Sequence, residues 1–478
     1  MTQYDIIIIG GGAVGAAMAR ELSRYKLRIA LFEKEAELAF GVSKSNSGII
    51  HPGTQHAVHS LKARLCVQGN ALTKKLAREL NIDFKQCGEL IVAFDETGVR
   101  RLLKIKDEGA ALGVKGLQMV DKAWLKKNEP NLSASVTAAL YAPSAGIISP
   151  YRWVYDFAEN AVRNGAEIYT GTEVTGLAPL KPGFEVSTTK GSFRARYVVN
   201  AAGLYADKIS AMAGVSDFQI HPRKGEEFLL DKKKEFITNH LLFPLPEKDT
   251  KGILVTRTSD GNPMIGPTAD DTTDKEDLST TEEGLQKVLA GARRLIPSIN
   301  EFDIIAYFAG LRPVAGDDFI IRHEEKAPGF INVAGIQSPG LTAAPAIALM
   351  VTSILKAKGL GLRRKLFFYR HRKRHVHLFA IPLAKTKHFI RKDASYGDII
   401  CRCEMVSDKE VRDAIAAGAR TMDGIKFRTR AQAGRCHGSF CTTRLMKILS
   451  EETSVPLAAV TKRGRGSEMI KKERVNDK

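Results

Sequence analysis

The sequence predicts an α/β fold in which a parallel sheet is interrupted by two mainly antiparallel, strand-rich insertions. Three stretches, residues 5–33, 151–203 and 330–356, combine short apolar strands with small-residue turns and helices, which is typical of β–α–β units. Residues 84–150 and 220–304 contain short strands instead, several of them with alternating apolar and polar residues. Because 478 residues are enough for two to four domains, we expect the β–α–β stretches to form one discontinuous domain.

The N-terminal stretch carries the strongest local signal. A β-branched strand is expected at residues 5–9, a helix at 16–25 and a second strand at 28–32. A glycine-rich turn precedes the helix and a carboxylate follows the second strand, at Gly10, Gly12, Gly15 and Glu33. This order is that of a dinucleotide-binding unit. The alternative, a tight glycine turn in another α/β domain, is disfavoured because strand, helix and carboxylate are all in register.

Each of these residues has a physical role in the prediction. Gly10 permits the tight turn, Gly12 lets the backbone approach a pyrophosphate, and Gly15 lets the helix pack closely on the strand. The pyrophosphate would lie at the helix N-terminus, where free N–H groups and the helix dipole favour an anion. Glu33 would accept hydrogen bonds from ribose hydroxyls, and its charge would disfavour a 2′-phosphate.

The net charge of +19 is concentrated in two segments. Residues 356–392 contain 13 Lys or Arg and no acidic residue, and residues 462–478 contain 7 basic and 3 acidic residues. The rest of the chain is almost neutral, so we expect no nucleic-acid partner. Such basic blocks are usually solvated linkers or tails, and a linker or subunit contact is our first interpretation of the longer one. Contact with an anionic membrane surface is the second, because aromatic residues lie among its cations.

The N-terminus predicts the cellular location. The longest apolar stretch, residues 6–19, is rich in glycine and too short to cross a bilayer. No basic region precedes it, as a secretory signal would require. We therefore expect a cytoplasmic protein, with peripheral attachment to the inner face of the membrane as the alternative.

Four of the six cysteines lie in the last fifth of the chain. They form a Cys-x-Cys pair and a Cys-x4-Cys pair separated by 32 residues: Cys401, Cys403, Cys436 and Cys441. Without an export signal, clustered cysteines indicate metal ligands or catalytic residues rather than disulfides. Four thiolates suit tetrahedral zinc or an iron–sulfur cluster, although structural zinc usually prefers Cys-x2-Cys spacing. Ser407 and Glu410 have the spacing of a helix capping box directly after the first pair.

Several motifs together resemble a known family. The N-terminal turn and the segments 43–53, 200–203, 308–313 and 335–342 resemble those of FAD-dependent oxidoreductases of the D-amino-acid-oxidase type. Within this family, the segment Asn46-Ser47-Gly48-Ile49-Ile50-His51 is most similar to the L-2-hydroxyglutarate dehydrogenase branch. The cysteine-bearing C-terminus is similar to anaerobic glycerol-3-phosphate dehydrogenase large subunits and to bacterioferritin-associated-ferredoxin-like [2Fe–2S] modules. This second resemblance favours a [2Fe–2S] cluster over zinc.

The resemblance implies a domain plan. An FAD-binding domain with a Rossmann-like fold is expected from residues 1–83, 151–219 and 305–358. A mainly antiparallel substrate domain is expected from 84–150 and 220–304. The remaining segments are a basic linker, a small helical [2Fe–2S]-binding domain and a basic tail, at residues 359–394, 395–455 and 456–478.

The resemblance also implies which residues hold FAD. The glycine turn and Glu33, with Lys34 nearby, would bind the AMP half. A second group would line the pyrophosphate, the adenine and the flavin: Ser43, Ser45, Asn46, Ser47, Gly48, Val174 and Gly203. A third group would bring backbone N–H groups to the edge of the flavin ring: Gly335, Gly340, Leu341 and Thr342.

Substrate residues follow from the chemistry of oxidising a secondary alcohol, which requires a base and an anchor for the substrate's anion. Arg312 stands where the family has an anion-binding arginine, and a guanidinium matches a carboxylate or phosphate. His51 could be the base. Lys224 and Glu226 lie in the segment that roofs the family's substrate site. Asp260 stands where the related branch usually has histidine, which leaves the substrate open.

We expect a dehydrogenase that oxidises a small anionic secondary alcohol and passes electrons singly through the cluster to a partner subunit or quinone. Glycerol 3-phosphate is the leading substrate, because of the cysteine-bearing domain. L-2-hydroxyglutarate or another 2-hydroxy acid is the second, and an amino or imino acid is the third. An electron-transfer subunit that has lost its own substrate is the alternative from another class.

Overall fold

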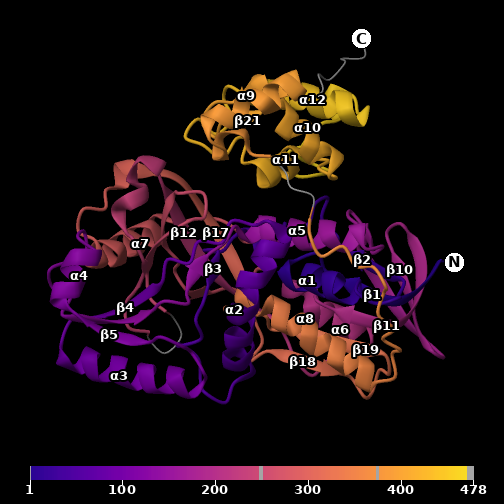
Figure 1. Cartoon of the computed structure of the whole chain (residues 1–478). Coiled ribbons are helices and arrows are strands. Elements are labelled where there is room, and N and C mark those ends of the chain that lie inside the picture. The colour runs from indigo at the N-terminus through magenta and orange to yellow at the C-terminus, as the bar shows by residue number, and fades with distance from the viewer. Residues whose placement is uncertain (1, 247–250, 373–375, 471–478) are drawn as a thin grey trace, which may run out of the picture. The chain divides into compact units, whose positions relative to one another are not determined.

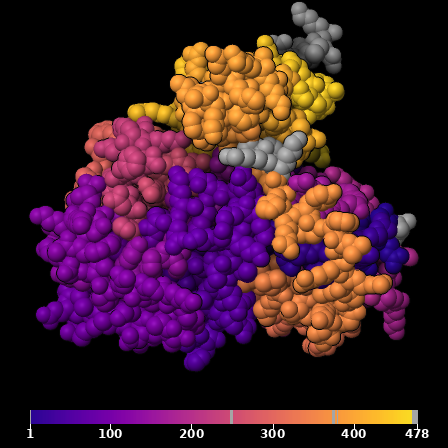
Figure 2. Space-filling model, in the orientation of Figure 1, coloured from indigo at the N-terminus to yellow at the C-terminus, as the bar shows by residue number. Residues whose placement is uncertain are grey.

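The computed structural model describes residues 2–246, 251–372 and 376–470. The chain divides into two compact units, which we call unit 1 and unit 2 (Figures 1 and 2). Unit 1 consists of Met1–Phe32, Ala39–Ile168 and Val174–His371. Unit 2 consists of Arg372–Lys478 together with two short segments, Glu33–Leu38 and Tyr169–Glu173.

The first sheet has the predicted parallel centre. Its order is β18-β19-β11-β1-β2-β8, and β1 is parallel to both β2 and β11, as β11 is to β19. The strands are β1 Thr2–Ile9, β2 Ile29–Phe32, β8 Glu167–Tyr169, β11 Gly191–Asn200, β18 Ile320–His323 and β19 Phe330–Ala334, with the hairpin β9 Val174–Leu180 and β10 Gly183–Thr188 beside β11. Ile6, Ile7 and Ile8 are fully buried, which explains the unbroken apolar run in the sequence.

Four helices of unit 1 pack on one another: α1 Ala13–Leu22, α2 Leu61–Leu80, α5 Pro150–Arg163 and α8 Gly340–Ala357. Helix α1 packs against α5 and α8, and α8 also packs against α2 (Figure 1). In the described part of the chain, α8 alone has the length and apolar composition of a membrane span, but 61% of that window is buried within the protein. It is therefore accounted for as a core helix.

The second sheet is mainly antiparallel, as predicted for the insertions. Its order is β16-β12-β15-β14-β13-β4-β6-β5, with β17 also paired to β12, and the β13–β4 pair is parallel. The strands are β4 Glu89–Ala93, β5 Gln118–Asp121, β6 Ala138–Ala142, β12 His221–Leu230, β13 Leu241–Phe243, β14 Leu254–Arg257, β15 Pro263–Gly266, β16 Asp270–Asp271 and β17 Ile304–Val314. Helices α3 Glu96–Ala111, α4 Lys122–Asn128 and α7 Glu282–Leu295 accompany it, and α6 Ala206–Met212 packs near the first sheet.

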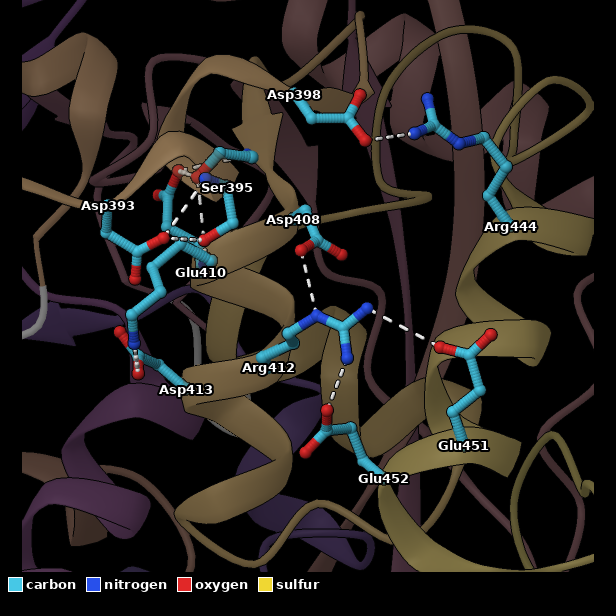
Figure 3. Close-up of polar contacts among 12 residues, drawn as sticks. Asp393, Ser395, Asp398, Asp408, Glu410, Arg412, Asp413, Arg444, Glu451 and Glu452 are labelled. Atoms are coloured by element: carbon cyan, nitrogen blue, oxygen red, sulfur yellow. Dashed lines mark hydrogen bonds and ion pairs between the residues drawn. The ribbon is translucent and has the colours of Figure 1, made fainter. Parts of the chain in front are cut away.

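Unit 2 is small and mostly helical. It contains α9 Leu383–Lys392, α10 Asp408–Ala416, α11 Met422–Thr429, α12 Thr442–Thr453 and the two-stranded sheet of β20 Ile399–Cys401 and β21 Val406–Ser407. The capping box at the start of α10 is confirmed, because Ser407 and Glu410 bond each other's backbone N–H. Arg412 joins α10 to α12 through ion pairs with Asp408 on its own helix and with Glu451 and Glu452 (Figure 3).

The stretch that we expected to be a basic linker contains ordered structure. Residues 359–371 belong to unit 1, where Lys365 N–H donates to the Arg24 carbonyl (2.9 Å) and Lys26 N–H donates to the Arg363 carbonyl (2.8 Å). Tyr369 N–H donates to Asn164 Oδ1 (2.9 Å). We call residues 362–371 the strap. Basic composition alone did not reveal these contacts, because they are made mainly by the backbone.

Candidate active site and cluster-binding site

The glycine turn has the geometry that a bound dinucleotide requires. Gly10 has φ +112°, and a Cβ there would lie 2.3 Å from the Ala201 carbonyl oxygen. A Cβ on Gly15 would lie 1.9 Å from the Gly10 carbonyl oxygen, so only glycine allows the helix to lie so close. Helix α1 begins directly after Gly12, with its N-terminus at the carboxyl end of β1. This cradle fits a pyrophosphate approached by backbone N–H groups.

The residues expected at the AMP half follow the neighbouring strands. Gly10 N–H bonds the Phe32 carbonyl, so the carboxyl ends of β1 and β2 are adjacent, and Glu33 is the next residue after β2. Within the Glu33–Leu38 segment, Glu33 Oε1 accepts the Glu35 N–H (2.9 Å) and Lys34 pairs with Glu35 (3.5 Å). In unit 1, Val174 is buried at the start of β9, and Gly203 has φ +57° in the turn after β11.

The loop of residues 43–48 is held by its own polar side chains. Ser43 Oγ accepts the N–H of Ala13 at the start of α1 (2.9 Å), which ties the loop to the glycine turn. Asn46 donates to the Ser43 carbonyl and accepts Gly48 N–H, both at 2.9 Å. A Cβ on Gly310 of β17 would lie 2.4 Å from the Ser45 carbonyl oxygen, so this loop and β17 are in close contact. No motif in the sequence indicated that these two segments are in contact.

The third predicted group lies at the start of α8. Gly335 has φ +65° in the turn after β19, and Gly340 and Leu341 begin the helix. Thr342 Oγ1 accepts the N–H of His51 (3.0 Å) and donates to the Ile49 carbonyl (3.2 Å). Thr342 therefore fixes the backbone of His51 against α8, and the structure brings these two predicted site residues together.

His51 lies in a cluster of ionisable groups that the sequence did not reveal. Its Nδ1 is 3.5 Å from Lys251 Nζ and 3.7 Å from Glu89 Oε2. Burial lowers the pKa of His51 well below 6.5, and the Lys251 charge lowers it further, so the ring is neutral and able to accept a proton. Glu89 is fully buried, and burial raises its pKa to about 7. Its Oε2 has no hydrogen-bond partner within the described residues.

A second cluster lies between β12 and β17. Arg312 Nη2 donates to the Thr268 carbonyl (3.1 Å), and burial lowers the Arg312 pKa while the Glu227 charge raises it. Glu227 Oε1 accepts the Ser47 hydroxyl (3.0 Å), and Glu227 Oε2 has no partner among the described residues. Burial raises the pKa of Glu227 to about 7. Burial lowers the pKa of Lys251, and the Arg312 charge lowers it further, so the two cations lie in one region of unit 1.

Three predicted substrate residues have other partners in this structure. Lys224 Nζ bonds Asp277 Oδ2 (2.8 Å), and Asp260 pairs with Arg152 (3.2 Å). Glu226 accepts both the N–H and the hydroxyl of Thr281, before α7. Adjacent residues of a strand face opposite sides of the sheet, so Glu227, rather than Glu226, lies beside Ser47. The sequence signal that could have identified Glu227 was this alternation along β12.

Sequence reasoning missed Lys251, Glu89 and Glu227. Lys251 stands in a loop and follows no motif. Glu89 begins a strand whose next four residues are apolar and buried, so a carboxylate at its head was a detectable sign. With Arg312 and His51, these three residues place two cations, a neutral imidazole and two carboxyls of raised pKa around one part of unit 1. Such a set can bind an anion and accept a proton from it.

The four clustered cysteines lie together in unit 2. The described residues contain no group of three or more His, Cys, Asp or Glu side chains already arranged to hold a metal ion. The sulfurs instead form two pairs: Cys403 and Cys436 are 3.4 Å apart, and Cys441 hydrogen-bonds Cys401, lowering the Cys401 pKa to about 6. The charge of Cys401 also acts on Cys436, so the two pairs are neighbours.

The surroundings of these sulfurs fit an anionic cluster. Backbone hydrogen bonds from Gln432 and Glu404 reach Cys401, and one from Gly438 reaches Cys436. Gly434 must be glycine, because a Cβ there would lie 2.3 Å from the Cys403 Cβ. Four thiolates with backbone N–H donors are the usual ligation of an iron–sulfur cluster.

Comparison with known proteins agrees with both sites. Residues 5–354 match the model for FAD dependent oxidoreductases, and residues 399–451 match the BFD-like [2Fe-2S] binding domain. A glycerol 3-phosphate dehydrogenase from Caloramator mitchellensis is 41% identical over 470 residues, 98% of each chain. Human mitochondrial L-2-hydroxyglutarate dehydrogenase is 35% identical over 285 residues, 56% of this chain and 61% of that protein.

A solved structure shares the fold. The L-alpha-glycerophosphate oxidase of Mycoplasma pneumoniae, with FAD bound, has a TM-score of 0.75 and 32% identity, covering 79% of this chain and 100% of that one. The predicted fold class and both predicted cofactors are thereby confirmed. The chain therefore belongs to the FAD-dependent oxidoreductase family and carries a BFD-like [2Fe–2S]-binding domain after its FAD-binding part.

Proposed function

We propose that the chain oxidises glycerol 3-phosphate to dihydroxyacetone phosphate. The observation that carries the proposal is the convergence of Arg312 and Lys251 on the region of the neutral His51 ring. Two cations suit the dianionic phosphate, and a neutral imidazole suits the removal of a hydroxyl proton. The dehydrogenase from Caloramator mitchellensis, similar over the full length, supports this substrate over the alternatives.

Each residue has a defined task in the reaction. Arg312 and Lys251 bind and orient the phosphate, and their burial strengthens the interaction because water is excluded. His51 takes the proton of the secondary hydroxyl, and Glu89 beside it stabilises the imidazolium that forms. Bound FAD supplies the acceptor for the hydride from the same carbon.

A 2-hydroxy acid such as L-2-hydroxyglutarate is the second candidate. The segment 46–51 and the similarity to the human dehydrogenase favour it, and a carboxylate would suit the same cations. An amino or imino acid is third. A subunit without its own substrate is the fourth, because Asp260 is engaged with Arg152 where the related branch has histidine.

Anaerobic bleaching of the flavin absorption separates these candidates. Glycerol 3-phosphate should bleach the flavin, and L-2-hydroxyglutarate, lactate and proline should do so far more slowly. The variant Arg312→Lys should raise the substrate concentration for half-maximal bleaching, whereas Arg322→Lys, at an exposed side chain of β18, should not. If another of the four compounds bleaches the flavin faster, that compound is the substrate instead of glycerol 3-phosphate. If none of the four bleaches the flavin, the subunit without its own substrate is favoured.

We further propose that the electrons leave through the [2Fe–2S] cluster to a partner subunit or a quinone. A cluster passes electrons singly, so it suits a dehydrogenase whose acceptor is another protein or a quinone rather than oxygen. Loss of iron and acid-labile sulfide in Cys436→Ser, with flavin bleaching retained, would test that the cluster lies downstream of substrate oxidation. Loss of bleaching in this variant would contradict that order.

We propose a cytoplasmic location with peripheral contact to an anionic membrane through the strap. Leu366 and Phe367 are 89% and 84% exposed among basic residues, while backbone hydrogen bonds of the strap keep that segment in place. Vesicles of phosphatidylglycerol should sediment the protein, and vesicles of phosphatidylcholine should not. The double variant Leu366→Ser/Phe367→Ser should lose this binding, whereas Phe302→Ser, an equally exposed residue between two acids, should keep it. Equal binding by both variants would refute the contact.

A further inference from the structure

A large apolar side chain is exposed between two cluster ligands. Phe440 is 84% exposed, although it stands between Cys436 and Cys441 in the loop that precedes α12. An aromatic side chain gains free energy only when it is buried, so a phenylalanine in this position has no role in the packing of unit 2. Its position between two cluster ligands distinguishes it from other exposed apolar side chains such as Leu383.

The loop holds Phe440 in a defined position. Ser439 N–H and Oγ both donate to the Cys436 carbonyl, at 3.0 and 2.7 Å, and Cys441 N–H donates to the Gly438 carbonyl (3.1 Å). Gly438 has φ +89°, where a side chain would be strained. The ring is thus presented by a tight turn, and little conformational entropy would be lost when a partner covers it.

The surroundings of Phe440 are basic and include a cluster ligand. Both cysteine loops expose cationic side chains, Arg402 in the first and Arg435 in the second, and Cys403 itself is exposed. The acidic residue of the first loop is Glu404. Only 4% of its side chain is exposed, and it pairs with Arg430 (2.9 Å). The charges that these two loops expose are therefore positive, and the exposed ligand Cys403 lies among them.

We propose that the face formed by Arg402, Cys403, Arg435 and Phe440, which we call the cluster face, docks a one-electron acceptor protein with an acidic surface. Electron-transfer contacts are small and transient, so one aromatic anchor inside a charged rim is sufficient. Opposite charge raises the rate of encounter and orients the acceptor's redox centre toward the cluster. The inference rests on the proposed function and names the chemistry of its electron-accepting partner.

The electron balance is simple. In each encounter the reduced cluster loses one electron and is oxidised, and the acceptor gains that electron and is reduced. Two encounters therefore remove the two electrons of one substrate molecule, and the two protons are released separately to solvent. The acceptor is the oxidant of this step.

Two haem proteins of opposite surface charge serve as probes. The soluble domain of cytochrome b5 surrounds its haem edge with carboxylates, and cytochrome c surrounds its haem edge with lysines. The full-length holoenzyme is reduced anaerobically with dithionite, desalted and mixed with each probe, and haem reduction is followed at low and at physiological salt. The same preparation of Cys436→Ser gives the rate at which electrons bypass the cluster, which is subtracted.

We expect cytochrome b5 to be reduced faster than cytochrome c, with a rate that falls as salt screens the charges. Phe440→Ser should lower the second-order rate for cytochrome b5 by about tenfold or more, as loss of an interface anchor does. Arg402→Glu, which leaves Arg435 as the remaining cation and no net charge on the cluster face, should remove most of the preference for cytochrome b5. Leu383→Ser, which alters an 82% exposed side chain of unit 2 outside the cysteine loops, should leave every rate unchanged.

A binding measurement complements the rates. Cytochrome b5 should bind the immobilised holoenzyme and should lose affinity for the Phe440→Ser variant, with iron content and cluster absorbance equal in both. A preference for cytochrome c, or an unchanged rate in Phe440→Ser, would overturn the proposal. A slower reduction of the cluster by substrate in this variant would also overturn it, because the face would then serve electron entry. Failure of every substrate to bleach the flavin would refute the proposed function alone, since dithionite reduces the cluster independently.

Discussion

Replacing Glu227 with glutamine should make the stability of unit 1 less sensitive to pH. Burial raises the Glu227 pKa from 4.5 to about 7, and Oε2 has no hydrogen-bond partner among the described residues. The folded state therefore binds more protons than the unfolded state between pH 4.5 and 7. Under this condition the free energy of unfolding falls as pH rises, and it stops falling above pH 7.

The size of the effect follows from the two pKa values. Each unit of pKa difference corresponds to about 1.4 kcal/mol, so this carboxyl should cost wild-type unit 1 about 2.5 kcal/mol between pH 5 and pH 8. Glutamine does not ionise, and Glu227→Gln should lack that loss. Ser47→Ala should have the opposite effect and steepen the loss, because the Ser47 hydroxyl stabilises the carboxylate and lowers its pKa.

Urea unfolding at pH 5 and pH 8, followed by tryptophan fluorescence and with the same FAD concentration, measures this difference. Both tryptophans, Trp124 and Trp153, lie in unit 1, so the signal is free of contributions from unit 2. The quantity compared is the change in unfolding free energy between the two pH values, which cancels any pH-independent effect of a substitution. If Glu227→Gln lost as much stability as wild type between pH 5 and pH 8, a buried carboxyl of raised pKa at this position would be refuted.

Three further predictions concern the two cofactor sites and the substrate site. Gly10→Ala should raise the dissociation constant for FAD by about a hundredfold or more, because its Cβ would collide with the Ala201 carbonyl. Gly41→Ala, which has open space around it, should bind FAD normally. Flavin fluorescence measures both dissociation constants. Glu37→Ala should destabilise unit 2 by about 3 kcal/mol, because it removes a buried carboxylate that pairs with Arg428 (2.9 Å) and accepts the Arg420 N–H (2.7 Å). Glu35→Ala removes an exposed pair and should cost about 1 kcal/mol or less. The urea midpoint for loss of cluster absorbance reports the difference, and equal midpoints would contradict it. Lys251→Met should raise KM for glycerol 3-phosphate by about tenfold to a hundredfold, which is the value of a hydrogen bond to a charged group. Lys224→Met should have a smaller effect, because Asp277 already binds that ammonium. Steady-state kinetics with an artificial acceptor measures both.

The parts of the site that are local in sequence could be predicted from it. The spacing of Gly10, Gly12 and Gly15 reflects steric limits that any helix after a parallel strand must obey, and the structure shows the predicted close approaches. The four clustered cysteines predict a metal site, because few other roles require four thiolates close together. The period-two pattern likewise identified the antiparallel insertions.

The strap and the ionisable cluster required the tertiary structure. Composition made residues 359–371 indistinguishable from a solvated linker. The strap is held by its backbone N–H and carbonyl groups and by the rings of Phe368 and Tyr369, whose partners lie far away in the sequence. His51 and Lys251 are separated by 200 residues, and Lys251 belongs to no motif. Their pairing, and the burial that shifts their pKa values, exist only once the strands of the second sheet are assembled.

The sequence by itself predicted the class of chemistry from a dinucleotide cradle, four thiolates for a cluster, and an arginine that the family resemblance assigns to the substrate's anion. The tertiary structure decided which charged groups lie together. On β12 it decided which residues face the Ser47 loop and which face α7. Because neighbouring residues of a strand point to opposite faces, one position separates Glu226, bonded to Thr281, from Glu227, beside Ser47. Both side chains are buried. Alternation along β12 shows only that they face opposite ways, and the packed sheet shows which of them lies beside Ser47.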